Sequence, residues 1–251
     1  MQREAFTIFG WPVYWYGVFF ATGFLAVVIF WTWLSRREGR SAETASDLAL
    51  WLMLGGVLGA RLAYVVSAWE EFSQEPLAIF RLWEGGLIYY GGLFGCVASG
   101  ILYAKVKKEP MLKLADFIIT AVPLGHGFGR IGCHFNACCY GRPTEAFWAI
   151  KLPEWAIKFP GEMVHPTQLL ESGFNFLLFV VLVKLYLKNK VPGRITAIYL
   201  LSYPVFRFLN EYLRGDHRMT SGVFDVAQSI SIGLFVSGVV FWCLIRPARE
   251  A

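Results

Sequence analysis

The chain has few charged residues for its length. Of its 251 residues, only 16% are Asp, Glu, Lys or Arg, against about a quarter in an ordinary soluble domain. Hydrophobic residues make up 56% and aromatic residues 17%. The net charge of +5 is not gathered in one basic patch, because Lys and Arg recur in short clusters between apolar stretches. This pattern argues against a disordered chain, a nucleic-acid binder and a cytosolic enzyme, and is typical of a polytopic membrane protein.

The first apolar stretch, residues 11–34, contains no charged residue. A secretory signal has an apolar core of only about 7–15 residues and a small-residue cleavage site. This stretch is longer, and Arg36 and Arg37 follow it almost at once. We therefore expect an uncleaved membrane helix here.

Seven stretches are long and apolar enough to cross a bilayer, which takes about 20 residues. They cover residues 11–34, 47–69, 87–105, 113–132, 167–187, 194–210 and 222–245. The fourth and sixth also contain proline and arginine. The expected fold is all-α, a polytopic membrane protein with seven transmembrane helices that form one integral-membrane domain over residues 1–251.

The connecting loops differ in basic charge. The segments after the first, third, fifth and seventh stretches are the most basic, with Arg36, Arg37, Arg40, Lys105, Lys107, Lys108, Lys113, Lys188, Lys190, Arg194, Arg246 and Arg249. The positive-inside rule then places the N-terminus outside and the C-terminus in the cytoplasm. The longest outer loop, residues 133–166, mixes aromatic and charged residues, and we expect an amphipathic segment on the outer membrane surface. A plain exposed loop is the alternative.

Ionisable side chains occur inside the predicted spans, where each costs a few kcal/mol. Arg61, Arg130 and Arg207 are the clearest cases, and the expected topology places all three in the outer half of the membrane. Tyr16 and Tyr90 fall at the same depth. An arginine near a helix end can instead extend its side chain to the interface. The convergence nevertheless predicts one polar site that faces outward.

Four polar residues repeat with helical spacing in the sixth stretch and just beyond it. Tyr203, Arg207, Glu211 and Arg214 are separated by four, four and three positions, so they share one helix face. An Arg207–Glu211 pair would hold its guanidinium in one pose. Because the planar guanidinium donates two parallel hydrogen bonds to a phosphate, we expect an outer-leaflet cavity for a phosphate-bearing ligand, most simply a lipid head group.

The five cysteines fall into two groups. Cys96 and Cys243 lie in apolar stretches and are expected to pack as small hydrophobic residues. Cys133, Cys138 and Cys139 begin the long outer loop, with a spacing that matches no common zinc pattern. We expect packing thiols and no metal. A disulfide, and a nucleophilic cysteine assisted by His134, are the alternatives.

Motifs along most of the chain resemble the prolipoprotein diacylglyceryl transferase family. They are Trp15-Tyr16-Gly17, Gly59-Ala60-Arg61-Leu62-Ala63-Tyr64-Val65, residues 83–93, Gly129-Arg130-Ile131-Gly132, Asn136, Tyr140-Gly141-Arg142, residues 165–171, residues 203–208, Glu211-Tyr212-Leu213-Arg214 and Gln228-Ser229. Each motif alone is weak, but the ordered set is specific.

The resemblance implies an enzyme of the bacterial inner (cytoplasmic) membrane, with seven helices and a site on the periplasmic side. Such an enzyme transfers the diacylglyceryl group of phosphatidylglycerol to the thiol of the lipobox cysteine in a prolipoprotein signal peptide. The products are a thioether and glycerol 1-phosphate. The implied partners are phosphatidylglycerol, the prolipoprotein and membrane lipids, with no nucleic acid, and no cofactor is expected.

The resemblance also implies roles for individual residues. Arg130 and Arg207 match essential arginines and are assigned to the phosphate. Tyr16, Asn136, Gly141, Tyr203 and Glu211 match further positions of functional weight, and Arg61, Gln168, Glu171 and Arg214 are weaker matches.

This chain departs from the family pattern at three positions. Tyr90 stands where the family often has a histidine, so we expect Tyr90 in the base position, as a tyrosinate or as a hydrogen-bond orienter. His134 and His165 are the fallback bases. Cys133 and Cys138 stand where many members have Asn and Glu.

Two other classes of function are considered. A transporter for an anionic solute would use the same arginines, but it predicts polar residues through the inner half of the membrane and favours an internal repeat, which the sequence does not show. A non-catalytic lipid-binding relative would keep the head-group site and lack the base, and Tyr90 is the feature that favours it.

Overall fold

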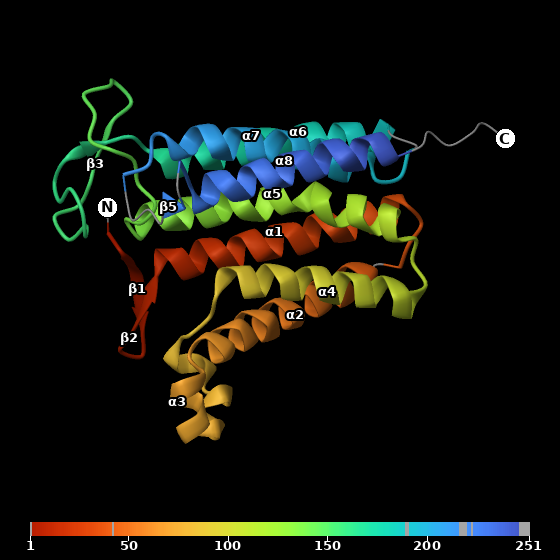
Figure 1. The fold of residues 1–251 in the computed structure, drawn as a ribbon, viewed down its shortest axis with the longest axis horizontal. Coiled ribbons are helices and arrows are strands. Elements are labelled where there is room, and N and C mark those ends of the chain that lie inside the picture. The colour runs from red at the N-terminus through yellow and green to blue at the C-terminus, as the bar shows by residue number, and fades with distance from the viewer. Residues whose placement is uncertain (1, 42, 189–190, 216–219, 222, 246–251) are drawn as a thin grey trace. The chain divides into compact units, whose positions relative to one another are not determined.

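The computed structural model describes residues 2–41, 43–188, 191–215, 220–221 and 223–245. Helices dominate the described chain (Figure 1). Its α-helices are α1 (Trp15–Arg37), α2 (Glu43–Ser67), α3 (Trp69–Gln74), α4 (Tyr89–Lys107), α5 (Met111–Phe135), α6 (Thr167–Lys188), α7 (Arg194–Glu211) and α8 (Val226–Leu244). All except the short α3 coincide with the seven stretches expected from the sequence, so the all-α prediction is confirmed.

Five of these helices are long and apolar enough to cross a membrane, namely α1, α2, α5, α6 and α8. The chain is therefore a multi-pass membrane protein. Of the seven spans expected, these five are supported by the length and hydropathy of their helices, and the full count of seven stays a prediction. Helix α7 carries Arg194, Arg207 and Glu211 within its length, and α4 is rich in glycine and ends in lysines, which lowers the hydropathy of both.

The chain forms two compact units. The first contains residues 1–27 and 115–251, and the second contains residues 28–114. Because α1 and α5 each contribute to both units, the boundary does not coincide with a linker. The single membrane domain expected from the sequence stays a prediction.

In the second unit, α2 and α4 pack closely through glycines (Figure 1). A Cβ atom added at Gly59 would lie 2.4 Å from the carbonyl oxygen of Gly91, and one added at Gly95 would lie 2.1 Å from that of Gly55. No side chain larger than hydrogen fits at these contacts. Small residues of this kind let membrane helices approach until their backbones touch.

In the first unit, the start of α7 is held by a buried carboxylate from α5. The oxygens of Asp116 accept hydrogen bonds from the backbone N–H groups of Gly193 (2.7 Å) and Thr196 (2.8 Å) and from the Thr196 hydroxyl (2.8 Å). Gly193 provides no capping side chain of its own, so Asp116 satisfies the free N–H groups at this helix end. Helix α8 begins with a capping box formed by Asp225 and Gln228.

The structure corrects the expected start of the first helix. Residues Glu4–Ile8 (β1) and Trp11–Tyr14 (β2) form an antiparallel hairpin, and α1 begins only at Trp15. Residues 11–14 were expected to be helical because Trp, Val and Tyr are as apolar as a membrane helix requires. The same residues also favour strands, and the Phe9-Gly10 turn, with positive φ at both residues, pairs them with β1.

The long loop between α5 and α6, described throughout, contains no helix beyond Phe135. Two short strands, β3 (Ile150–Lys151) and β4 (Met163–Val164), pair within it. The loop has a small core of its own, made of Ala137, Tyr140, Leu152, Ala156 and Val164. Phe147 and Ile157 are more than nine-tenths exposed. Contact between this loop and the membrane surface stays a prediction.

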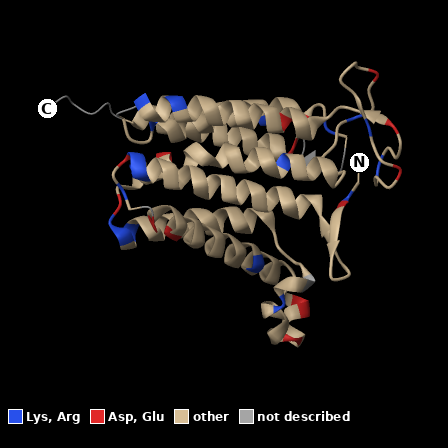
Figure 2. Ribbon diagram, turned by 180° about the vertical axis from the view of Figure 1, so that it is seen from behind, with Lys and Arg blue, Asp and Glu red and all other residues tan. Residues whose placement is uncertain are grey.

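Residues 69–84 contain helical structure that the sequence analysis did not anticipate. Helix α3 is followed by the 3₁₀ helices η1 (Pro76–Phe80) and η2 (Leu82–Glu84). Lys and Arg lie mainly at helix ends and in connecting segments, with few along the helices (Figure 2). Lys190, Arg246 and Arg249, which contributed to the expected orientation, lie outside the described residues.

A candidate active site in the first unit

The first unit gathers ionisable side chains from three helix ends. Arg130 lies in the last turns of α5, Glu171 at the start of α6, and Arg207 and Glu211 at the end of α7. Because α5 and α7 run opposite to α6, these ends meet. The site therefore lies at one end of the helices, as the alternating topology predicts.

Glu171 is the centre of this site and is only 2% exposed. Its Oε1 atom lies 3.1 Å from Nη2 of Arg130 and accepts a hydrogen bond of 3.2 Å from the Tyr203 hydroxyl. His126 Nε2 lies 3.5 Å from the same oxygen, and Asn210 Nδ2 donates to Oε2 at 3.4 Å. A carboxylate that accepts from Tyr203 and Asn210 is fixed in position, and through its ion pair it fixes Arg130 in turn.

A second ion-pair group follows on α7. The Arg207 guanidinium pairs with the Glu211 carboxylate, as the i,i+4 spacing predicts, so that expectation is confirmed. Arg214 Nη1 lies 3.5 Å from the same Glu211 oxygen. Arg214 itself lies just beyond the end of α7, in an isolated bridge with Gly141. The guanidinium groups of Arg207 and Arg214 thus share one carboxylate.

His126 and Tyr203 connect the two groups. Each lies within electrostatic range of Arg130, Arg207 and Glu171, and their rings are 5.3 Å apart. His126 Nε2 accepts a hydrogen bond of 3.2 Å from Arg130 Nε, which requires a neutral imidazole. Both arginines therefore lie near the His126–Tyr203 pair.

Positive charge is concentrated in the described part of this site. Three guanidinium groups, those of Arg130, Arg207 and Arg214, meet two carboxylates, those of Glu171 and Glu211. These five side chains together carry one excess positive charge. All three arginine side chains are largely buried, with 11–16% of their surface exposed. Guanidinium groups gathered in this way suit a phosphate, since each can donate two parallel hydrogen bonds to it.

Four more of the expected residues lie around this cluster. Tyr16 packs against Gly132 of α5 and lies within electrostatic range of Arg130. Asn136 accepts a hydrogen bond of 3.1 Å from Arg3. Gln168 donates from Nε2 to the Cys138 carbonyl at 2.9 Å. Position 141 has no room for a side chain, because a Cβ there would lie 2.5 Å from both the Cβ atom and the carbonyl oxygen of His165.

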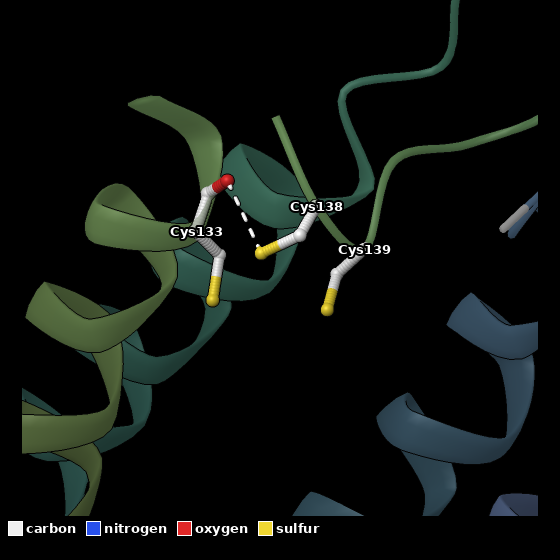
Figure 3. Close-up of side chains that lie close together, drawn as sticks. All are labelled: Cys133, Cys138 and Cys139. Carbon is white, nitrogen blue, oxygen red and sulfur yellow. Dashed lines mark hydrogen bonds between the residues drawn. The ribbon is translucent and has the colours of Figure 1, made fainter. Parts of the chain in front are cut away.

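Three cysteine thiols converge where α5 ends and the long loop begins (Figure 3). The Sγ atoms of Cys133, Cys138 and Cys139 all lie within 4.8 Å of one another, and none is in a disulfide. A hydrogen bond from the Cys133 thiol lowers the pKa of the Cys139 thiol, and the positive charges of Arg214 and Arg130 lower it further. The sequence analysis did not predict that all three would converge.

Two of the expected residues, Arg61 and Tyr90, belong to the second unit. The Arg61 guanidinium donates to the carbonyls of Ala78 (2.6 Å), Gly85 (2.7 Å) and Ile79 (2.8 Å), and it lines a cavity of about 240 Å³. It thereby secures the segment that carries η1 and η2. Tyr90 lies in the first turn of α4, is 40% exposed and contacts the Tyr89 ring. A substrate role for either residue stays a prediction.

His126 and Asn210 were not among the expected site residues, although both contact Glu171. Each had a sequence signal. His126 is one turn before Arg130 on α5, and Asn210 is seven positions after Tyr203 on α7, close to the same face. His165, a fallback base, accepts a hydrogen bond of 3.0 Å from Trp148 Nε1 at its Nδ1 atom.

The fold and this site define a multi-pass membrane protein with a buried arginine–carboxylate cluster at one end of its helices. A family model described as prolipoprotein diacylglyceryl transferase matches residues 3–244. The chain therefore belongs to the prolipoprotein diacylglyceryl transferase family.

Named relatives agree with this assignment. A protein of Finegoldia magna is 35% identical over 96% of this chain and 94% of its own length. One of Clostridium tetani is 33% identical over the full length of both chains, and one of Bacillus cereus is 36% identical over 100% of this chain and 94% of its own. All three are named phosphatidylglycerol–prolipoprotein diacylglyceryl transferase.

Proposed function

We propose that this protein transfers the diacylglyceryl group of phosphatidylglycerol to the thiol of the lipobox cysteine of prolipoproteins. The new bond is a thioether, and the departing group is glycerol 1-phosphate. The observation that carries this proposal is the cluster of Arg130, Arg207 and Arg214 around two carboxylates at one end of membrane helices. The family membership and the names of the relatives support the same reaction.

Arg130 and Arg207 bind the phosphate of the lipid in this mechanism. As the thiol sulfur attacks the glyceryl carbon, the bond from that carbon to the phosphate oxygen breaks, and negative charge grows on the departing phosphate ester. Guanidinium groups already held in place stabilise this charge without reorganising. Glu171 and Glu211 provide that preorganisation, since each holds an arginine by an ion pair.

The attacking thiol must lose its proton. Tyr90 stands at the sequence position where the family often has a histidine, and on that ground we assign it to the thiol. It acts there either as a tyrosinate base or as a hydrogen-bonding residue that orients the thiol. An ordinary tyrosine has a pKa near 10, whereas a thiol has a pKa near 8.5 and needs only modest assistance. His134 and His165 are the alternative bases.

The site faces the extracytoplasmic side of the bacterial inner membrane in this proposal. Lys184, Lys188 and Arg194 lie at the opposite end of α6 and α7 from Glu171 and Arg207. The positive-inside rule places that basic end in the cytoplasm. The N-terminus is then periplasmic, the C-terminus is cytoplasmic, and α4 and α7 complete seven spans.

The test uses the purified full-length chain in phosphatidylglycerol micelles with a synthetic lipobox peptide. We expect a peptide whose mass has increased by one diacylglyceryl group, together with release of glycerol 1-phosphate. A peptide with serine in place of the lipobox cysteine is the control and should remain unmodified. If the cysteine peptide binds but stays unmodified at high enzyme concentration, the protein is a non-catalytic lipid-binding relative and the proposal is wrong.

A further inference from the structure

Cys133 lies in the last turn of α5, and Cys138 and Cys139 lie in the loop that follows. Their thiols have no part in the proposed transfer, yet they converge. Cys138 and Cys139 are adjacent in the sequence, and their side chains point to one region together with Cys133 (Figure 3). This requires unusual backbone at two non-glycine residues, since φ is +44° at Ala137 and +62° at Cys139. Conformations of this kind are strained for residues other than glycine and persist only where the surroundings impose them.

The surroundings do impose this conformation. Two side chains at the start of α6 hold the backbone of the cysteine pair, because Thr167 Oγ1 donates to the Cys139 carbonyl at 2.7 Å and Gln168 Nε2 donates to the Cys138 carbonyl at 2.9 Å. The backbone N–H of Cys138 also donates to the Cys133 carbonyl at 3.1 Å. The backbone that carries Cys138 and Cys139 is therefore held in place before any ligand arrives.

We propose that Cys133, Cys138 and Cys139 form a three-thiolate site for a thiophilic metal ion of the Zn²⁺ type. In a tetrahedral zinc site each Zn–S bond is about 2.3 Å, which places the sulfurs about 3.8 Å apart. The three Sγ atoms already lie within 4.8 Å of one another, so small side-chain rotations complete the geometry. Within the described chain, no fourth Cys, His, Asp or Glu joins this group, which leaves one coordination position for water.

The groups around the sulfurs suit bound thiolates. Asn136 Nδ2 lies 3.7 Å from Cys138 Sγ and donates to it, the kind of outer contact that tunes metal ligands. The Cys138 thiol donates to the Cys133 carbonyl at 3.6 Å. When the metal displaces that proton, the carbonyl keeps its bond from the Cys138 N–H.

The local charge also favours the site. Three thiolates and one divalent ion together carry a single negative charge. Arg130 and Arg214 both interact electrostatically with Cys139 and offset that charge. The proposal departs from the spacing argument, which expected no metal because Cys-His-x3-Cys-Cys matches no common zinc pattern. The metal-site proposal rests on the closeness of the three sulfurs in the structure, which the sequence spacing does not reveal.

The test measures metal binding directly and does not depend on transferase activity. The untagged, full-length chain is purified in detergent under reducing, anaerobic conditions, stripped with a chelator and titrated with Co²⁺ and then Zn²⁺. We expect about one ion per chain, a sulfur-to-cobalt charge-transfer band, and loss of that band when zinc replaces cobalt.

Variants locate the site. Cys139→Ser should weaken binding by more than about 100-fold, and Asn136→Asp by about tenfold, the range for outer contacts to a metal ligand. Cys243→Ser, which changes a thiol on the exposed side of α8, should bind like the parent chain. If the serine variants fail to fold, alkylation of the parent chain gives the same answer, because zinc should protect Cys133, Cys138 and Cys139 but not Cys243.

Two results would overturn the proposal. One is a reduced, folded chain that takes up no cobalt or zinc. The other is a pair of these three cysteines that remains in a disulfide under reducing conditions and excludes the metal. Transfer activity in a chain that binds no metal would leave the proposed function standing and remove only the metal site.

Discussion

Arg130 on α5 and Glu171 on α6 form a buried ion pair, with 3.1 Å between Nη2 and Oε1. Glu171 also accepts from the Tyr203 hydroxyl and from the Asn210 amide. One carboxylate therefore joins three helices and sets the pose of Arg130, the arginine that the proposed mechanism assigns to the phosphate. The family resemblance ranked Glu171 among the weaker matches, but the geometry gives it the central positioning role.

Glu171→Gln should reduce turnover strongly. The glutamine side chain has the same shape but no charge, so Arg130 loses its ion pair and its fixed orientation. We expect kcat in the micelle assay to fall about 100-fold, which corresponds to about 2.7 kcal/mol of transition-state stabilisation. The matched control is Glu154→Gln, because that carboxylate is 80% exposed in the long loop and faces Lys151 at 3.9 Å. Equal kcat for parent and Glu171→Gln would exclude the positioning role.

Arg207→Lys tests whether the fork of the guanidinium matters beyond its charge. Lysine keeps the positive charge but cannot donate two parallel hydrogen bonds to a phosphate. We expect kcat/KM for phosphatidylglycerol to fall by about 10- to 100-fold, the range for loss of one charge-assisted bond. Arg36→Lys, at the exposed end of α1, should leave kcat/KM unchanged. A fully active Arg207→Lys enzyme would mean that charge alone suffices.

Gly141→Ala should disturb the segment that carries Arg214. The added Cβ would meet the His165 backbone and side chain at 2.5 Å and the Leu213 carbonyl at 2.9 Å. Overpacking of this kind costs about 1–3 kcal/mol, so both the unfolding temperature and the turnover should fall. Gly173→Ala on α6 is the matched control, since a Cβ there meets nothing within 4 Å. A Gly141→Ala protein as stable and active as the control would contradict the close packing.

Asp116→Asn should lower the stability of the protein. Asp116 caps α7 from within the first unit and is 3% exposed. Loss of its charge should destabilise the protein by about 1–2 kcal/mol, as for other helix caps. Unfolding in detergent is the measurement, and Asp47→Asn is the control because its pair with Lys107 is nearly half exposed. An unchanged transition for Asp116→Asn would show that the cap contributes little.

The positions of the long helices followed from the sequence because continuous apolar stretches bounded by charge leave few other folds in a membrane. The hairpin β1–β2 did not, since Trp11–Tyr14 is as apolar as the helix that follows it. Hydropathy measures how favourably side chains move from water into a membrane, and it does not report whether the backbone pairs as strands or forms a helix. The helical segment from Trp69 to Glu84 is too short and too polar to give such a signal.

The site was predictable where its contacts are local. The Arg207–Glu211 pair lies within one helix, so spacing alone identified it. The contacts of Glu171 with Arg130 and Tyr203 join different helices, and no periodicity encodes which faces meet. The convergence of the cysteines depends on positive φ at Cys139, a conformation that is rare for a residue other than glycine.

Release of glycerol 1-phosphate by Arg130→Ala and Arg207→Ala, measured beside the parent chain and Arg36→Ala, tests the central claim most directly. Both site variants should release it at least about 100-fold more slowly, because each loses a guanidinium aimed at the departing phosphate, whereas Arg36→Ala should match the parent. Release at the parent rate by folded Arg130→Ala and Arg207→Ala would contradict the assignment of these arginines to the phosphate.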